Sequence, residues 1–260
     1  MTSEPTLVPD AAGTPRERLE AVLYELRRVV VGQDRLLDRV LVALLSRGHI
    51  LLEVMAEGHA SIAGETHPTP SPFFVLATQN PIESEGVYAL PEAQVDRFAM
   101  KLVVGYPSQA DEEEIVRRMA SDAPQPRQLL DPGQILELQA AADAVFVDHR
   151  VRAYAVRLVT ATRDPGSEGL GQLAPYLDLG GSPRASLALV RGARALAVMR
   201  GRTYAAPEDV HALFHDVLRH RVVLSYEALA AEVLPDQVLD AILEAIPQPD
   251  VEMGSGRSIA

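Results

Sequence analysis

The chain has 260 residues, 47% of them hydrophobic, which is enough for one large domain or two domains of ordinary size. The net charge is −12, and the sequence shows no basic patch of the kind that a general nucleic-acid-binding protein carries. No nucleic-acid partner is therefore expected. It has no cysteine, which excludes disulfides and cysteine-ligated zinc sites.

Membrane and export signals are missing from the sequence. The longest apolar runs are far shorter than the ~20 residues of a transmembrane helix, so no membrane insertion is expected. The first 20 residues lack the charged start and apolar block of a signal peptide. A chain without cysteine fits a reducing compartment, and a cytoplasmic location is predicted.

The N-terminal part predicts two helices and a strand. Residues 1–18 are expected to be a disordered segment that leads into a helix, with Thr14 as a plausible N-cap and Pro15 at the first helical position. After the turn "VVVGQ", the stretch "DRLLDRVLVALLSRG" predicts a second amphipathic helix. "HILLE" at 49–53 is typical of a buried strand, but "LLEVMAEG" is rich in helix formers, so a helix over 50–57 remains open.

Three further elements are predicted before residue 108. "GHASIAGETHP" favours a β-hairpin that turns at Ala63-Gly64. "FFVLATQNP" is a continuous apolar run that ends in polar residues, typical of a strand buried on both faces of a parallel sheet. "LPEAQVDRF" predicts a short helix, and "AMKLVVGYP" predicts another buried strand.

From Ser108 onward the apolar pattern is helical throughout. Asp131-Pro132 and Ser182-Pro183 each combine a capping residue with a proline at the first helical position. The predicted organisation is therefore an α/β part over 19–107, a helical part over 108–250 and a flexible tail over 251–260.

Three stretches, "VVVGQDRLLDRVLVALLSRGHILLE", "PFFVLATQNPIESEGVYALPEAQVDRF" and "GGSPRASLALVRGARALAVMRGRTYAAPEDV", together resemble MoxR-type AAA+ ATPases. The "ATQNP…LPEAQ.DRF" block is distinctive, and the resemblance runs from about residue 19 to residue 246. It implies an α/β fold, a truncated AAA+ parallel sheet with helices, followed by an all-α lid domain. It also implies an enzyme that binds and hydrolyses ATP with Mg²⁺ to remodel or mature partner proteins.

The resemblance implies roles for two groups of residues in the α/β part. Val31, Gly32 and Gln33 match the turn that packs near the adenine in such ATPases. Asn80, at the end of "VLATQN", matches the sensor-1 residue that positions the attacking water. Structural alternatives are a tight turn beside the core for the first group and a strand-end cap for Asn80.

Two arginines complete the implied site. Arg97 in "DRF" matches the arginine finger, which reaches the γ-phosphate held by a neighbouring subunit. Arg184 in "GGSPRA" matches sensor 2, presented to the nucleotide by a lid helix. Arginine suits both roles because its planar fork stays charged and pairs bidentately with phosphate oxygens. The structural alternatives are a surface ion pair between Arg97 and Asp96, and a solvated first-turn position for Arg184.

The phosphate-binding loop and the Mg²⁺-binding acidic pair of the family are missing from this sequence. No G-x-x-x-x-G-K-[ST] loop occurs, and the single lysine, Lys101, follows Met100 inside an apparent strand. The acidic pair that would hold Mg²⁺ after a hydrophobic strand is absent too, because "DEEE" at 111–114 is typical of a helix start. ATP binding and hydrolysis are therefore predicted to be lost or severely impaired.

The segment that would carry the phosphate-binding loop and the acidic pair is predicted to be missing at the junction Leu51-Leu52-Glu53. Our hypothesis is an in-frame deletion between two similar short stretches, which at ~30 residues per βαβ unit removes about 60 residues or more. In the AAA+ sheet that the resemblance implies, the remaining strands are neighbours, with "HILLE" between "AMKLVVG" and "FFVLAT". Losing the strands beyond "FFVLAT" would leave an apolar strand edge exposed.

Three functional interpretations remain open: an ATPase by lineage whose activity is lost or crippled, a non-catalytic subunit that offers Arg97 to an intact neighbour, and a helical binding module over 108–250. The resemblance implies protein partners, among them von Willebrand factor A-domain proteins, and a homo- or hetero-oligomeric ring. No metal site is predicted, because Ala212 between His211 and His215 takes the place of the glutamate in the zinc motif H-E-x-x-H.

Overall fold

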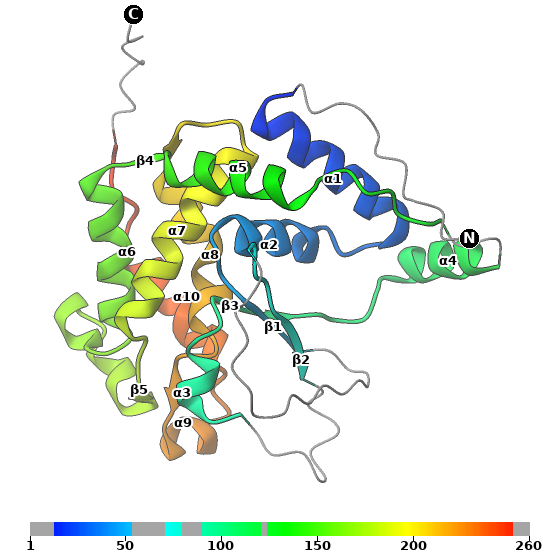
Figure 1. Cartoon of the computed structure of the whole chain (residues 1–260). Coiled ribbons are helices and arrows are strands. Elements are labelled where there is room, and N and C mark those ends of the chain that lie inside the picture. The colour runs from blue at the N-terminus through cyan, green and yellow to red at the C-terminus, as the bar shows by residue number, and fades with distance from the viewer. Residues whose placement is uncertain (1–12, 54–70, 80–89, 121–123, 252–260) are drawn as a thin grey trace, which may run out of the picture.

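The computed structural model describes residues 13–53, 71–79, 90–120 and 124–251, and it combines a small parallel sheet with a larger group of helices (Figure 1). The predicted fold, an α/β part followed by a helical lid, is confirmed. The hairpin predicted at Ala63-Gly64 and most of the predicted tail lie outside the described residues. Within the described ranges, no helix has the length and apolar character needed to cross a membrane.

The sheet has the predicted strand order. β1 (Ile50–Glu53) lies in the middle, and β2 (Leu76–Gln79) and β3 (Met100–Val103) pair with it in parallel on either side. Leu51 is fully buried between its neighbours. The strand interpretation is therefore confirmed for residues 50–53, and a helix that starts at residue 50 is wrong; residues 54–57 lie outside the described ranges.

β2 differs from the expectation of a strand buried on both faces. Its residues alternate between exposed and half-buried, and Leu76 keeps 44% of its surface exposed. β2 is at the edge of the sheet, and no further strand pairs with it among the described residues. The apolar run was a sound indicator of a strand, but the layer that would bury it is not in the described part of the chain.

Two helices precede the sheet. α1 (Pro15–Val29) begins with a capping box, in which the Thr14 side chain accepts from the backbone N–H of Glu17 and the Glu17 carboxylate accepts from that of Thr14. Residues 15–18 are therefore helical, and the boundary of the N-terminal segment predicted at residue 18 is wrong by this turn. α2 (Asp34–Leu45) buries its apolar face against the core.

The helical part is arranged around α7 (Pro183–Met199), which packs against α1, α2, α5, α6 and α8 (Figure 1). It is not purely helical, because four short strands form two ribbons that the sequence pattern did not predict. The other elements are α5 (Pro132–Asp143), β4 (Phe146–Val147), α6 (His149–Ala161), η1 (Pro165–Glu168), η2 (Gly171–Tyr176), β5 (Leu177–Leu179), β6 (Tyr204–Ala205), α8 (Pro207–Leu218), β7 (Val223–Leu224), α9 (Tyr226–Ala230) and α10 (Pro235–Ala245).

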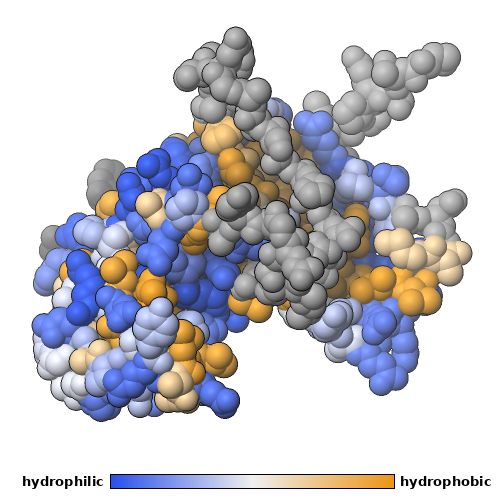
Figure 2. Space-filling model, turned by 90° about the horizontal axis from the view of Figure 1, so that it is seen from below, coloured by the Kyte–Doolittle hydropathy of each residue, from blue (hydrophilic) through white to orange (hydrophobic). Residues whose placement is uncertain are grey.

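α4 (Gln109–Met119) lies apart from the other helices of this part (Figure 1). The Arg118 guanidinium donates to the backbone carbonyls of Arg27 and Arg28, so α4 is tied to the end of α1. Val116 and Met119 on this helix are largely exposed. Seen from below, apolar surface gathers at the end of the molecule where α4 lies (Figure 2). The short α3 (Glu92–Val95) leads into β3.

Candidate functional site

The carboxyl ends of the three parallel strands meet at one edge of the sheet, where ligands bind in open α/β folds. Glu53 aligns with Gln79 on β2 and with Val103 on β3. Asn80, the predicted sensor-1 residue, follows Gln79 directly but lies outside the described residues. The family pattern expects a phosphate-binding loop directly after β1, and the residues that follow Glu53 lie outside the described ranges.

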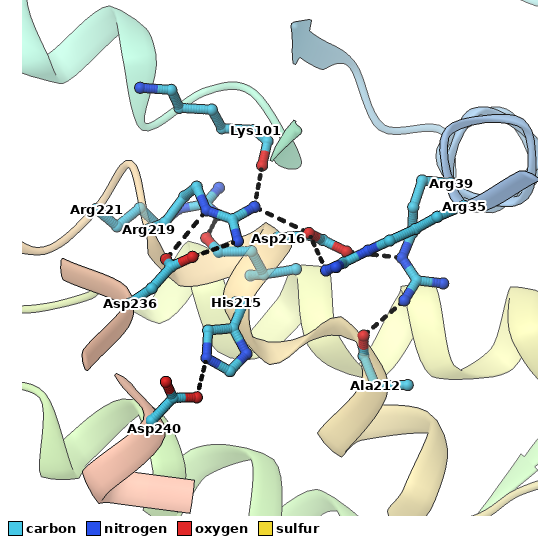
Figure 3. Close-up of polar contacts among 11 residues, drawn as sticks. Arg35, Arg39, Lys101, Ala212, His215, Asp216, Arg219, Arg221, Asp236 and Asp240 are labelled. Atoms are coloured by element: carbon cyan, nitrogen blue, oxygen red, sulfur yellow. Dashed lines mark hydrogen bonds and ion pairs between the residues drawn. The ribbon is translucent and has the colours of Figure 1, made fainter. Parts of the chain in front are cut away.

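Lys101 is in the middle of β3, as predicted. It aligns with Leu51 of β1, and its backbone carbonyl accepts a hydrogen bond of 3.0 Å from Arg219 Nη1 (Figure 3). A phosphate grip needs a lysine at the start of the helix that follows β1. The chain has no other lysine to place there. The chain therefore has no lysine at the place where a phosphate-binding loop would need one.

Val31, Gly32 and Gln33 form the turn between α1 and α2, as predicted. Gly32 has φ +71°, a conformation that glycine adopts without strain. A Cβ atom placed on Gly32 would lie 2.5 Å from Cγ of Asp111. The first turn of α4 therefore covers this turn with a carboxylate, a contact that the sequence pattern did not indicate.

Arg97 is exposed at the turn between α3 and β3. No ion pair joins it to another described residue, so the proposed alternative of a surface pair with Asp96 is not what the structure shows. Arg97 lines a cavity of about 510 Å³ whose walls are largely apolar. Its neighbours there are His49, Phe73, Val75, Leu90, Gln94 and Phe98.

Arg184 is in the first turn of α7, and its Nη1 atom lies 3.1 Å from Oδ2 of Asp96. Ser182 caps the same helix by accepting from the backbone N–H of Arg184 at 3.2 Å. The Ser182 hydroxyl also donates to the Asp96 carboxylate at 3.1 Å. The predicted sensor-2 residue is therefore bound to the residue that precedes the predicted arginine finger.

Arg221 is the site residue that sequence reasoning missed. Its Nε atom lies 2.9 Å from Oδ1 of Asp96, and its side chain is only 2% exposed. Burial alone would raise the pKa of Asp96, but hydrogen bonds from Arg221 and Arg184 outweigh it and hold that pKa below its ordinary value. The dense "RHR" run at 219–221 was the available signal, although it does not specify a partner 125 positions away.

A second cluster of arginines surrounds Asp216 on α8, whose side chain is 1% exposed (Figure 3). It accepts from Arg35 at 2.8 Å, from Arg39 at 2.7 Å and from Arg219 at 2.9 Å. Arg219 also pairs with Asp236 of α10 at 2.9 Å. This cluster joins α2, α8 and α10, and it lies beside β3 rather than at the carboxyl edge of the sheet.

The histidines on α8 form no metal site with other described residues. No group of three or more potential ligands occurs in the described ranges. His215 instead places its Nε2 atom 2.9 Å from Oδ1 of Asp240 on α10 (Figure 3).

A parallel sheet followed by a helical lid, with Arg184 on the lid facing the α3–β3 turn, is the architecture of an AAA+ ATPase. Two family models match the chain. Residues 25–100 match the ATPase family associated with various cellular activities (AAA), and residues 173–242 match the AAA lid domain. A crystal structure from Cytophaga hutchinsonii, of a protein described as a candidate ATPase, has a TM-score of 0.83 and 28% identity and covers 91% of this chain and 96% of that one.

Similar proteins show to which family of AAA+ ATPases the chain belongs. The chain is 39% identical over 312 residues to Chaperone MoxR1 of Mycobacterium tuberculosis, a match that covers 90% of this chain and 83% of that protein. It is 31% identical over 215 residues to Protein MoxR of Methylorubrum extorquens, covering 77% of this chain and 62% of that protein. The chain therefore belongs to the MoxR-type AAA+ ATPases.

Proposed function

We propose that this chain is a MoxR-type subunit that has lost the ability to grip ATP and Mg²⁺ in its own site through an internal deletion. Residues 54–75 are all that connects β1 to β2, and they contain neither a lysine nor a G-x-x-x-x-G-K-[ST] loop. The match to Chaperone MoxR1 runs over 312 positions, more than the 260 residues of this chain, so it includes positions without a counterpart here. Both facts support a deletion after Glu53.

The placement of Lys101 carries this proposal. The only lysine is held inside β3, two residues before its end, with Leu51 of β1 as its neighbour. Catalysis of phosphoryl transfer depends on positioning and on charge placed at the phosphates. Without a lysine or acidic pair at the carboxyl edge of the sheet, no described group supplies that charge from within the subunit.

Nucleotide binding tests the loss of the grip directly. A fluorescent ATP analogue with Mg²⁺ is titrated into this chain and, as the positive control, into a relative that has the complete loop. We expect saturable binding by the relative and none by this chain up to about 1 mM, where the binding free energy falls to about −4 kcal/mol. Micromolar affinity for this chain would show that the grip is intact.

The exposure of Arg97 favours a second function, in which this chain supplies an arginine finger to an intact neighbouring subunit. Its side chain is exposed and has no ion pair with another described residue, whereas the neighbouring Asp96 is bound by Ser182, Arg184 and Arg221. A guanidinium supplied in trans stabilises transition-state charge and accelerates phosphoryl transfer by ~10³–10⁵ in well-studied GTPases. Arg97 is available for such a contact.

Mixing experiments test this second function. An intact relative is mixed with the wild-type chain or with Arg97→Ala, and the ATPase rate per intact subunit is measured. We expect the wild type to support a rate at least tenfold above that with Arg97→Ala. Arg191→Ala, which removes an exposed arginine on α7, is the matched control and should behave as wild type. Equal rates with all three proteins would reject the role of Arg97.

The wider setting is proposed from the family alone. One relative is named a chaperone. We propose by extension that this chain acts on partner proteins in the cytoplasm, as a member of a homo- or hetero-oligomeric ring, with von Willebrand factor A-domain proteins among its partners. Pull-down of the intact relative by the tagged chain, followed by sizing of the complex, tests the ring.

A further inference from the structure

The guanidinium of Arg221 uses all five of its N–H groups. Nε donates to the Asp96 carboxylate at 2.9 Å, and Nη2 donates to the backbone carbonyls of Asp96 at 3.0 Å and Phe98 at 2.6 Å. Nη1 donates to the carbonyls of Ala99, at 3.1 Å, and Val217. An arginine side chain has no further donor, so this one is saturated by a single segment and its own helix end.

The carbonyls that Arg221 binds lie on both sides of Arg97 in the chain. His220 adds a contact of 3.1 Å from its Nε2 atom to the carbonyl of Phe98, and Arg219 binds the carbonyl of Lys101. The three residues that follow α8 therefore hold the backbone from 96 to 101, while the side chain of Arg97 remains exposed. Burial lowers the pKa of Arg221, and the pairing with Asp96 opposes that effect.

The opposite side of Asp96 is held by the lid helix α7. Ser182 and Arg184 both bind its carboxylate, as described above, so two separate elements of the lid converge on the residue before Arg97. A side chain in such a network cannot change position without breaking several charge-assisted hydrogen bonds. A movement of the lid would therefore also move the α3–β3 turn.

We infer that Arg221 is a positioning residue for Arg97, and that it couples the direction of the Arg97 side chain to the orientation of the lid. This rests on the proposed role of Arg97 in trans. A displacement of about 1 Å at a catalytic group can lower a rate by ~10². Loss of Arg221 should therefore impair a neighbour's ATP hydrolysis without removing Arg97 itself.

The test uses the full chain mixed with the intact relative, and compares wild type with Arg221→Gln, Arg221→Lys and Arg97→Ala. We expect Arg221→Gln to lower kcat of the mixture by up to roughly 10²-fold and by no more than Arg97→Ala does, with KM for ATP unchanged. Arg221→Lys keeps the charge but has only three donors, so its loss should be intermediate. The double variant with Arg97→Ala should be no slower than Arg97→Ala alone.

Amide hydrogen exchange separates this inference from the proposed function. The N–H groups of Arg97, Phe98 and Ala99 are hydrogen-bonded in the folded chain, so a loosened turn exchanges faster. We expect faster exchange over 96–100 in Arg221→Gln and unchanged exchange in α5. If Arg97→Ala has no effect on the mixture but exchange rises, the trans role fails and the coupling of turn and lid stands.

Two outcomes would overturn the inference: unchanged exchange over 96–100 in a folded Arg221→Gln, or loss of kcat in Arg221→Gln beyond that of Arg97→Ala. If Arg221→Gln does not fold, Asp96→Asn replaces it, because this variant preserves the volume of the side chain and the backbone contacts of Arg221. Asp96→Asn should raise amide exchange over 96–100 by a smaller factor than Arg221→Gln. Unchanged amide exchange in Asp96→Asn would again overturn the coupling of the turn to the lid.

Discussion

Arg39 on α2 and Asp216 on α8 form an ion pair of 2.7 Å in which the side chains are only 10% and 1% exposed. Arg39 also donates from Nη2 to the backbone carbonyl of Ala212, so its guanidinium binds α8 at two points (Figure 3). Arg39 and Asp216 are 177 positions apart in the sequence, and their pair joins the α/β part to the helical part. A helical module that folds independently of the sheet is therefore less well supported than a lid fixed to its core.

Asp216→Ala should lower the free energy of unfolding by about 3–5 kcal/mol, because it leaves buried guanidinium groups without their shared carboxylate. Urea unfolding followed by circular dichroism measures the change. Asp143→Ala breaks an exposed pair with Arg47, 2.6 Å long, and should cost less than about 1 kcal/mol. Equal losses in the two variants would show that burial of the Asp216 cluster has no energetic weight.

The three strands could be predicted from the sequence, because each is a short apolar run between turn residues, and their order followed from the resemblance to the AAA+ sheet. The helix starts at Pro15, Pro132 and Pro183 were predictable for a similar reason, since a cap and a proline are local signals. The exposure of Leu76 was not, because it depends on whether a strand lies beyond β2.

The candidate site could be predicted only in its parts. Motifs identified Arg97 and Arg184 as candidate residues, but not the carboxylate of Asp96 that one of them binds. Arg221 was missed because a side chain that saturates backbone carbonyls leaves no sequence pattern at the partner residues. Periodicity reports which face of a helix is buried, whereas these contacts depend on how two distant turns meet.

Gly32→Ala should destabilise the chain by more than about 1 kcal/mol, because φ is +71° and the new Cβ would overlap the Asp111 carboxylate. Thermal unfolding of both variants checks this, with Gly105→Ala as the control, since nothing lies within 4 Å of a Cβ at that position. In an Asp111→Ala background the cost should shrink, since only the backbone strain remains. An unchanged cost would mean that Asp111 does not press on the turn.

Leu76→Lys should reduce self-association of the chain. A charged residue on an exposed sheet edge blocks pairing with another strand, and the segment from Pro72 to Pro81 carries no charge of its own. Light scattering at increasing protein concentration measures the effect. Leu187→Lys, which replaces an exposed leucine on α7, is the matched control and should associate as wild type. If both lysine variants scatter equally, the β2 edge is not the site of association.

The stability of the chain should fall as the pH drops from about 6.5 to 5, because the largely buried surroundings of His220 favour its neutral form in the folded chain. Burial, and next the nearby charge of Arg221, lower the pKa of His220 to about 3; Lys101 adds to this effect, whereas Asp96 and the hydrogen bond to Phe98 oppose it. In the unfolded chain the pKa is about 6.5. The unfolded state binds about half a proton more than the folded state at pH 6.5 and nearly one more at pH 5, so the slope of the free energy of unfolding steepens from about 0.7 to about 1.4 kcal/mol per pH unit.

His220→Gln should remove this slope, because glutamine keeps an N–H donor for the carbonyl of Phe98 but does not titrate. Urea unfolding at pH 7.5, 6.5, 5.8 and 5 measures the slope, and His149→Gln, which replaces an exposed histidine, should leave it as in the wild type. The pKa of Asp96 is lowered below its ordinary value near 4, so this carboxylate stays charged throughout the window and contributes nothing to the slope. A wild-type slope in His220→Gln would assign the acid sensitivity to another group.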